Sequence, residues 1–362
     1  MKKRRKNKMF KKIIALIFVV GIILFVYTML NGKTPFFIGN LHKNQNPNDV
    51  SFDPDDEQKI PTEPKIKIYN MDSKTRPIAV MIDNEKNAWP QQTGLQQAYM
   101  VYEIIVEGGI TRLLALYKDQ NISKIGPVRS ARHYYLDYAL ENDAIFTHFG
   151  YSPQALNDIK ALKVNNISGT QADDSAFWRD TKIAGWQNIY TTTNNLTSRA
   201  AAKKYRTTST TKPILNYSIN EIDLSTSSNA IPADLVRIHY SNSHYVGYEY
   251  DEENQLYKRY MVGRAHVDTV TGKQYTVKNL IVYNVRNYPL NDGSGKGRQG
   301  LDNLGNGTGY YITDGYAIPI KWEKSSRAGK TIYKDLEGNE IKVNDGNTFV
   351  HLQPQNQKLT IE

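Results

Sequence analysis

The 362-residue chain contains no cysteine, and this absence excludes several kinds of site at once. The chain can form no disulfide, offer no thiolate to a metal ion and supply no cysteine nucleophile. It also lacks the cysteine through which a lipoprotein is anchored to a membrane. A domain of this size can bury enough apolar surface to be stable without disulfides, so the composition is compatible with a location outside the cytoplasm.

Motifs for catalysis and for metal binding are missing as well. The chain has no G-x-S-x-G nucleophile motif. An acidic run, DPDDE, lacks the glycine and the later glutamate that a calcium loop needs. We therefore expect no cofactor and no metal site. The histidines that show no ligand spacing with one another are His133, His148, His239, His244 and His266.

One glycine-rich segment matches a known pattern formally. GKGRQG (295–300) fits the G-x-G-x-x-G fingerprint of dinucleotide-binding proteins. It neither follows a clear strand nor opens a helix, which the fingerprint requires. We interpret it as a long mobile loop that closes over or contacts a partner.

The positive charge is concentrated at the beginning of the chain. Residues 1–12 contain eight lysines and arginines and no acid, so the net charge of +10 falls to +2 when they are set aside. The charge is therefore a signal for membrane topology and not a nucleic-acid-binding face. We expect no nucleic-acid partner.

An uncharged apolar run follows at Ile13–Leu30 and is long enough to cross the hydrocarbon core of a membrane. A cleaved signal peptide is the alternative, but no A-x-A pattern follows Leu30. We expect a retained single-pass signal anchor, with the basic tail in the cytoplasm and the bulk of the chain extracytoplasmic. The Cys-free composition, rich in Lys and Asn, suits the outside of a Gram-positive-type bacterial membrane.

Composition then divides the rest of the chain into three parts. Residues 31–64 are rich in Pro, Asp and Asn and have almost no aliphatic pattern, which predicts a disordered tether. Residues 65–224 alternate strand-like and helix-like segments, which predicts an α/β domain with a mixed sheet. Residues 231–362 consist of short runs rich in Tyr and Val between turns, which predicts a mainly β domain.

The first folded part contains the clearest predicted elements. Strands are expected at 78–82, 100–106, 110–117 and 144–149, with the second and third joined as an antiparallel hairpin by a Gly-Gly turn. Ser130 is expected to cap a helix that runs to about Asn142, and Ser152 a second helix to about Lys163. A third helix is expected over 198–205. In the second part, the expected strands are 236–240, 244–250, 256–263, 274–277, 280–285, 331–335, 340–343 and 348–352.

Charged residues recur where the predicted strands of the first part stop. Arginines at the start of a helix or at a strand end can bind phosphate or carboxylate, and strand ends are where ligands bind in α/β sheets. The sequence therefore predicts an anion-binding site there, with acids in support. The candidate anion-binding residues are Arg112, Arg129, Ser130 and Arg132, and the supporting acids are Asp83, Glu103 and Glu107.

Two alternatives to this site remain open. Glu103 and Glu107 would salt-bridge the arginines internally and lock the sheet to the helix. Asp83 would hold a cation or act as a base, or would simply form an Asx turn.

His148 lies inside an apolar strand and is expected to be a core histidine with satisfied hydrogen bonds.

Six segments spread over both folded parts have the same resemblance: 76–84, 102–112, 125–139, 148–156, 257–285 and 331–352. Together they resemble the YerB-like family, a two-part bacterial family of unknown function. The resemblance covers nearly the whole chain after the tether. It implies an extracytoplasmic, membrane-tethered protein near peptidoglycan synthesis, and it supplies no catalytic residues. Many members of the family are lipoproteins anchored by a lipidated cysteine, and here a transmembrane helix would serve instead.

The sequence thus favours a membrane-anchored cell-envelope protein that binds or scaffolds. Its partner would be a cell-wall precursor or an envelope protein, held at the arginine-rich anion site. The alternative is a metal-dependent enzyme acting on a lipid-linked pyrophosphate wall precursor, with Asp83 holding Mg²⁺ or serving as base. That alternative rests on a loose similarity of layout to the LytR–CpsA–Psr phosphotransferases.

Overall fold

The structure is a computed structural model, and it describes residues 67–68, 70–170, 173–209 and 211–362. The basic tail, the predicted membrane span Ile13–Leu30 and nearly all of the predicted tether lie outside the described residues. Within the described part, no helix is both long and apolar enough to span a membrane. Glu63–Glu362 forms one compact unit.

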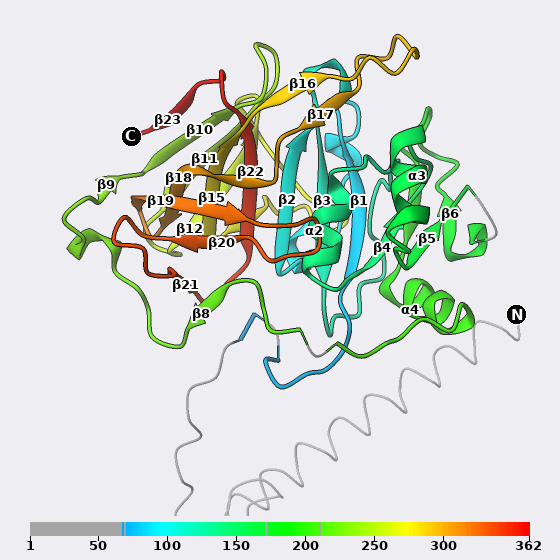
Figure 1. Cartoon of the computed structure of the whole chain (residues 1–362), viewed down its shortest axis with the longest axis horizontal. Helices are drawn as coiled ribbons and strands as arrows, with labels where there is room; N and C mark the ends of the chain where they lie inside the picture. The colour runs from blue at the N-terminus through cyan, green and yellow to red at the C-terminus, as the bar shows by residue number, and fades with distance from the viewer. Residues whose placement is uncertain (1–66, 69, 171–172, 210) are drawn as a thin grey trace, which may run out of the picture. The chain divides into compact units, whose positions relative to one another are not determined.

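An eleven-stranded mixed sheet is the centre of this unit (Figure 1). It combines strands from both predicted parts of the chain, because β2 pairs in parallel with β22. A short additional strand, β9 (Ile231–Pro232), pairs with β19. The other strands in spatial order are β20 (Ile332–Lys334), β19 (Tyr316–Lys324), β18 (Gly305–Thr313), β15 (Asn279–Val285), β22 (Thr348–Pro354), β2 (Met100–Ile105), β3 (Thr111–Tyr117), β1 (Ile78–Asn84), β4 (Ile145–His148) and β5 (Asn166–Ser168).

A smaller six-stranded sheet is antiparallel and comes entirely from the second part of the chain. Three pairs of short strands complete the β structure. The six strands are β13 (Arg264–Ala265), β12 (Leu256–Met261), β11 (Tyr245–Asp251), β10 (Leu235–His239), β23 (Leu359–Ile361) and β14 (Thr276–Val277). The pairs are β16 (Asn287–Pro289) with β17 (Gln299–Leu301), β8 (Asn216–Ser218) with β21 (Lys342–Asn344), and β6 (Phe177–Arg179) with β7 (Ile189–Thr191).

Different elements pack on the two faces of the large sheet. Successive side chains of a strand point to opposite faces. On β2, the Tyr102 hydroxyl donates to Glu141 of helix α2 (Tyr135–Glu141), whereas Glu103 contacts Arg259 of the small sheet. Helix α2 therefore covers one face, and the small sheet packs on the other (Figure 1).

Most predicted elements of the first part are confirmed. The sheet there is mixed, and β2 and β3 form the expected antiparallel hairpin around the short 3-10 turn η3 (Glu107–Gly109). Helix α3 (Pro153–Ala161) begins as predicted, with the Ser152 hydroxyl accepting a hydrogen bond from the Ala155 N–H. Helix α4 (Thr193–Ala202) begins five residues before its predicted start. The mainly β character of the second part is confirmed as well.

The predicted helix start at Ser130 is wrong. Helix α2 begins only at Tyr135. The preceding segment bonds to β1 and to the segment after β4 instead. The Arg129 N–H donates to the Met81 carbonyl and the Ala131 N–H to the Gly150 carbonyl, both at 2.9 Å. The Ser130 hydroxyl caps no helix and donates to the Phe149 carbonyl at 3.0 Å.

The direction of the strands collects polar groups along one edge of the large sheet. Strands β1, β2 and β4 run the same way, so their carboxyl ends share this edge with the amino end of the antiparallel β3. The predicted site acids and arginines lie on these strand ends and on the segments that follow them. The fold thus brings most of the predicted site residues to one region.

Candidate functional site

Two of the predicted arginines are held by the same carboxylate. Arg132 Nε donates to Glu107 Oε2 at 2.8 Å, and its second nitrogen donates to Oε1 of the same group. Arg112 donates more weakly to Glu107 Oε1, at 3.4 Å, and strongly to the Ser130 carbonyl, at 2.7 Å. Glu107 therefore occupies the place between Arg112 and Arg132 that an external anion would need.

The third arginine has a carboxylate of its own. Arg129 Nε lies 2.7 Å from Asp83 Oδ2, and the side chains are 22% and 2% exposed. The guanidinium of Arg129 therefore already contacts the Asp83 carboxylate. A metal ion or a substrate proton would have to compete with Arg129 for that carboxylate. Among the described residues, no three His, Asp or Glu side chains gather closely enough to hold a metal ion.

The pKa values of this group follow from burial and from the pairing. Burial would raise the pKa of Glu107, but the hydrogen bond and charge of Arg132 and the charge of Arg112 outweigh it and bring the pKa to about 2. Burial lowers the pKa of Arg112 to about 10, and the nearby charge of Arg132 acts in the same direction. Glu107 and Arg112 therefore both stay ionised at neutral pH.

Glu103 belongs to a different group of residues. It is fully buried between the two sheets, and its Oε2 accepts a hydrogen bond from Arg259 of β12 at 2.7 Å. Its Oε1 accepts from the Asn84 amide at 3.0 Å and from the Thr111 hydroxyl at 2.8 Å. A buried carboxylate needs this complete set of donors, because an unpaired buried charge is costly. We call Glu103, Arg259 and the side chains that are hydrogen-bonded to them the Glu103 network.

Hydrogen-bond donors fix the protonation of His351 in this network. Arg259 can only donate, and it donates to the Tyr248 hydroxyl, so this hydroxyl is free to donate to His351 Nε2 at 2.9 Å. The Tyr240 hydroxyl donates to the Glu103 carbonyl and so accepts from His351 Nδ1, also at 2.9 Å. His351 is therefore neutral, with its proton on Nδ1. Burial lowers its pKa to about 3, which agrees with this arrangement.

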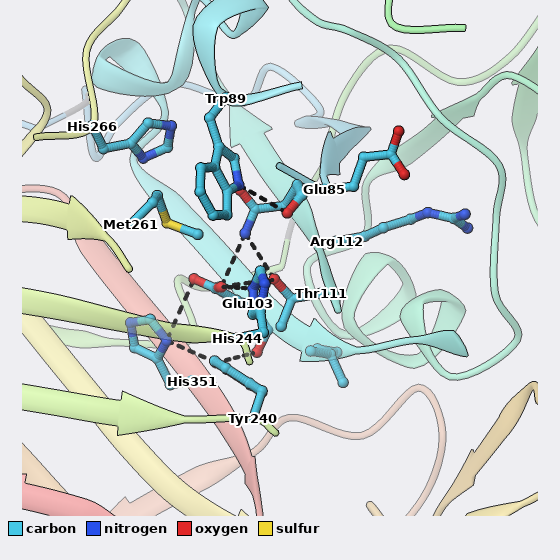
Figure 2. A network of polar contacts seen from close by, with 12 residues as sticks. Glu85, Trp89, Glu103, Thr111, Arg112, Tyr240, His244, Met261, His266 and His351 are labelled. Atoms are coloured by element: carbon cyan, nitrogen blue, oxygen red, sulfur yellow. Dashed lines mark hydrogen bonds and ion pairs between the residues drawn. The ribbon is translucent and has the colours of Figure 1, made fainter. Parts of the chain in front are cut away.

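Burial would raise the pKa of Glu103 too, but the charge of Arg259 holds that pKa well below its usual range. On the other side of the carboxylate, His244 Nε2 lies 2.9 Å from the Thr111 hydroxyl. That hydroxyl already donates to Glu103, so His244 is the donor in this contact. Figure 2 shows Glu103 between His351 and the pair formed by Thr111 and His244.

A pocket of about 410 Å³ opens beside the Glu103 network. Trp89, in the 3-10 turn η1 (Trp89–Gln91), gives it an aromatic wall, and Met261 and His266 line it from the small sheet and the segment after it. We call this cavity the Trp89 pocket. Its full lining is Lys86, Asn87, Trp89, Pro90, Met261, Arg264, Ala265, His266 and Val267.

The sequence pattern does not single out Arg259, Trp89 or His351 as site residues. Arg259 lies in a strand whose residues alternate between buried and partly exposed, where an arginine is expected to face solvent. His351 lies in a run whose apolar neighbours predict a core strand. The only signal in the sequence was Glu103 itself, a charge inside a buried strand that requires a buried partner.

His148 takes the role predicted for it. It is fully buried, its Nδ1 donates to the Gly150 carbonyl at 2.7 Å, and its Nε2 accepts from the Asn166 amide at 3.1 Å. Burial lowers its pKa to about 4. His148 is thus a neutral core histidine with both ring nitrogens satisfied.

Comparisons with known proteins agree with this fold. A family model described as the N-terminal domain of a protein of unknown function (DUF3048) matches residues 66–206, and the C-terminal domain of that description matches residues 236–350. The chain is 29% identical over 282 residues to YerB of Bacillus subtilis (strain 168), a candidate lipoprotein. That match covers 77% of this chain and 81% of the relative. The crystal structure of the YerB protein from Bacillus subtilis matches with a TM-score of 0.70 and 28% identity, over 80% of this chain and 94% of that one.

Proposed function

The chain belongs to the DUF3048, or YerB-like, family of proteins of unknown function, and on this premise we propose that it is a membrane-anchored extracytoplasmic protein of the bacterial cell envelope. Its role would be to bind or scaffold a component of cell-wall (peptidoglycan) synthesis. The description of the Bacillus subtilis relative as a candidate lipoprotein supports a protein that is attached to the membrane with its bulk on the outer side. In this cysteine-free chain the apolar run Ile13–Leu30 would replace the lipid as the anchor.

One observation carries the binding role: the arginines of the predicted site outnumber the carboxylates that pair with them. Among the described residues, Arg112, Arg129 and Arg132 share two ion-pair partners, Asp83 and Glu107. The Nε of Arg112 has no hydrogen-bond acceptor among the described residues. An anionic group would supply the missing negative charge and the missing acceptor.

Each of these acids is held by an arginine, as is Glu103, and this favours binding over chemistry. Glu103 and Glu107 are poor general bases, because the neighbouring arginines hold the pKa of each carboxyl low. Asp83 has a guanidinium contact of its own, with Arg129. The arrangement is instead a rigid set of charges, which suits recognition of a fixed anionic group. The partner would be an anionic wall precursor or an acidic segment of an envelope protein.

A thermal-unfolding experiment on the purified full chain in detergent tests the anion site. Pyrophosphate and soluble peptidoglycan fragments are added to the wild type and to the Arg129→Ala/Arg132→Ala variant. A ligand that binds only the folded state raises the melting temperature, so we expect stabilisation of the wild type and none of the variant. The matched control is Arg237→Ala/Lys321→Ala, which removes two exposed cations elsewhere. Equal stabilisation of wild type and Arg129→Ala/Arg132→Ala, or no stabilisation of either, would refute the anion site.

A further inference from the structure

The Trp89 pocket has an apolar wall that is already oriented. The indole N–H of Trp89 donates to the Asn84 carbonyl at 3.0 Å, and His244 lies behind the ring at a centroid distance of 6.1 Å. Because its N–H is committed, Trp89 offers the pocket its carbon surface and no donor. Met261 adds a polarisable thioether to the same wall.

The walls of the pocket are fixed by the Glu103 network beneath it. Arg259 donates to Met261 Sδ at 3.3 Å and, through Nε, to His266 Nδ1 at 3.0 Å. His266 donates from its other ring nitrogen to Gln92. A buried ion pair thus orders the pocket's side chains before any ligand arrives, and this lowers the entropic cost of binding.

The rim of the pocket is positively charged and unpaired. Lys86 and Arg264 are exposed, and neither has an ion-pair partner in the described part of the chain. No carboxylate is among the residues that line the pocket. Asn87 contributes an amide that can both donate and accept. The arginines of the proposed anion site differ in this respect, since each contacts an acid.

We propose that the Trp89 pocket binds a saccharide ring that carries a carboxylate or a phosphate. A pyranose ring has a flat face of C–H groups that can stack on the carbon surface of Trp89, and a rim of hydroxyls that can reach Asn87. Its anionic substituent would lie between Lys86 and Arg264, where it meets two cations without competition from an internal acid. The volume of about 410 Å³ is within the range of small-molecule pockets. This site is separate from the arginine set of the proposed function and does not depend on it.

Saturation-transfer NMR and titration calorimetry on the purified full chain in detergent test the proposal. The probes are glucuronic acid, glucose 6-phosphate, neutral glucose and benzoate, which is an aromatic acid without a sugar ring. We expect a charged sugar to bind about tenfold or more tightly than glucose, because it gains charge-assisted contacts with two cations. The charged sugar that binds more tightly identifies a carboxylate or a phosphate as the natural substituent, and equal binding of both shows that charge alone decides.

Three variants separate the two parts of the site. Lys86→Ala/Arg264→Ala should lose this preference, with about tenfold weaker binding of the charged sugar and unchanged binding of glucose. Trp89→Ala should weaken both sugars, whereas Trp89→Phe, which keeps an aromatic face, should restore much of the binding. Arg237→Ala/Lys321→Ala removes the same charge outside the pocket and should change nothing. The proposal is overturned if benzoate binds and the sugars do not, if no charged sugar binds at millimolar concentration, or if the pocket variants bind like the wild type.

Discussion

Arg259 contributes to the fold through its charge and to the Trp89 pocket through its hydrogen bonds. It is fully buried, and its donors reach Glu103, Tyr248, Met261 and His266. Burying an ion pair gains little over burying two apolar side chains, but removing one partner leaves the other charge unpaired. The cost of substitution therefore depends strongly on whether Glu103 stays charged.

We predict that Arg259→Ala lowers the free energy of unfolding by about 3–5 kcal/mol. Glu103→Gln/Arg259→Met should recover a large part of this loss, because it replaces the ion pair with neutral groups of similar volume. Urea unfolding followed by circular dichroism measures both. A loss below about 1 kcal/mol in Arg259→Ala would show that solvent, and not Arg259, satisfies Glu103.

At the scale of single elements, the turn between β2 and β3 positions Glu107 for Arg112 and Arg132. Gly108 and Gly109 follow it, both with φ of +72°. This left-handed conformation costs an L-residue about 1–2 kcal/mol. The two glycines differ in their surroundings, since a Cβ at Gly109 would come within 2.9 Å of the Ser241 Cβ, whereas one at Gly108 would meet nothing within 4 Å.

We predict that Gly108→Ala costs about 1 kcal/mol of stability, from backbone conformation alone. Gly109→Ala should cost about 1–3 kcal/mol more, because the added methyl group must displace Ser241. Adding Ser241→Gly to Gly109→Ala should remove this difference and bring the loss back to that of Gly108→Ala. Chemical denaturation of the four proteins, wild type included, checks the ranking, and equal losses for the two alanine variants would contradict it.

How far the sequence predicts an element depends on where its backbone hydrogen bonds go. Strands such as β1 follow from a local run of apolar residues, and α3 follows from its Ser-Pro start, so both were predictable. Ser130 has the residue type of a helix cap, yet the backbone on either side of it bonds to Met81 and Gly150. Local patterns carry no information about such distant partners, so the helix start was misplaced.

The same limit holds for the candidate site at the scale of the whole molecule. The sequence grouped seven charged and polar residues near one another, and the structure does bring most of them to one edge of the sheet. It separates Glu103 from that group, because the partner of Glu103 lies 156 residues later in the chain. Packing of the small sheet, which carries Arg259 on β12, against the face of β2 creates this contact, and residue types alone do not specify packing partners at such a separation.

Buried titratable groups should make the stability of the whole molecule depend on pH. The pKa of His351 falls from its ordinary value of 6.5 to about 3 on folding, and that of His148 falls to about 4. As the pH falls, the unfolded chain therefore binds these protons before the folded protein does. The contribution of both histidines to the free energy of unfolding is complete above pH 6.5 and is lost as the pH drops toward 4. The lowered pKa values of Glu103 and Glu107 add a further loss below about 4.5, since stability from a carboxyl with a depressed pKa disappears as the pH falls through its folded value.

We predict a constant unfolding free energy between pH 7 and pH 8, and a loss of up to about 1.4 kcal/mol per pH unit for each buried histidine between pH 6 and pH 4. His351→Gln removes one titrating group and should make this slope shallower by about one proton. Denaturation midpoints measured across this pH range with unchanged buffer ionic strength provide the test. A His351→Gln slope equal to that of the wild type would show that His351 is not neutral in the folded protein.

The pairing of β2 with β22 also affects the order in which the newly made chain can fold. Met100 lies opposite Thr348, so the middle of the large sheet cannot close until nearly 250 residues beyond β2 have emerged. If the chain crosses a membrane as proposed, this pairing would leave the middle of the large sheet open during transfer. The Glu103 carboxylate would stay hydrated until Arg259 is available to pair with it.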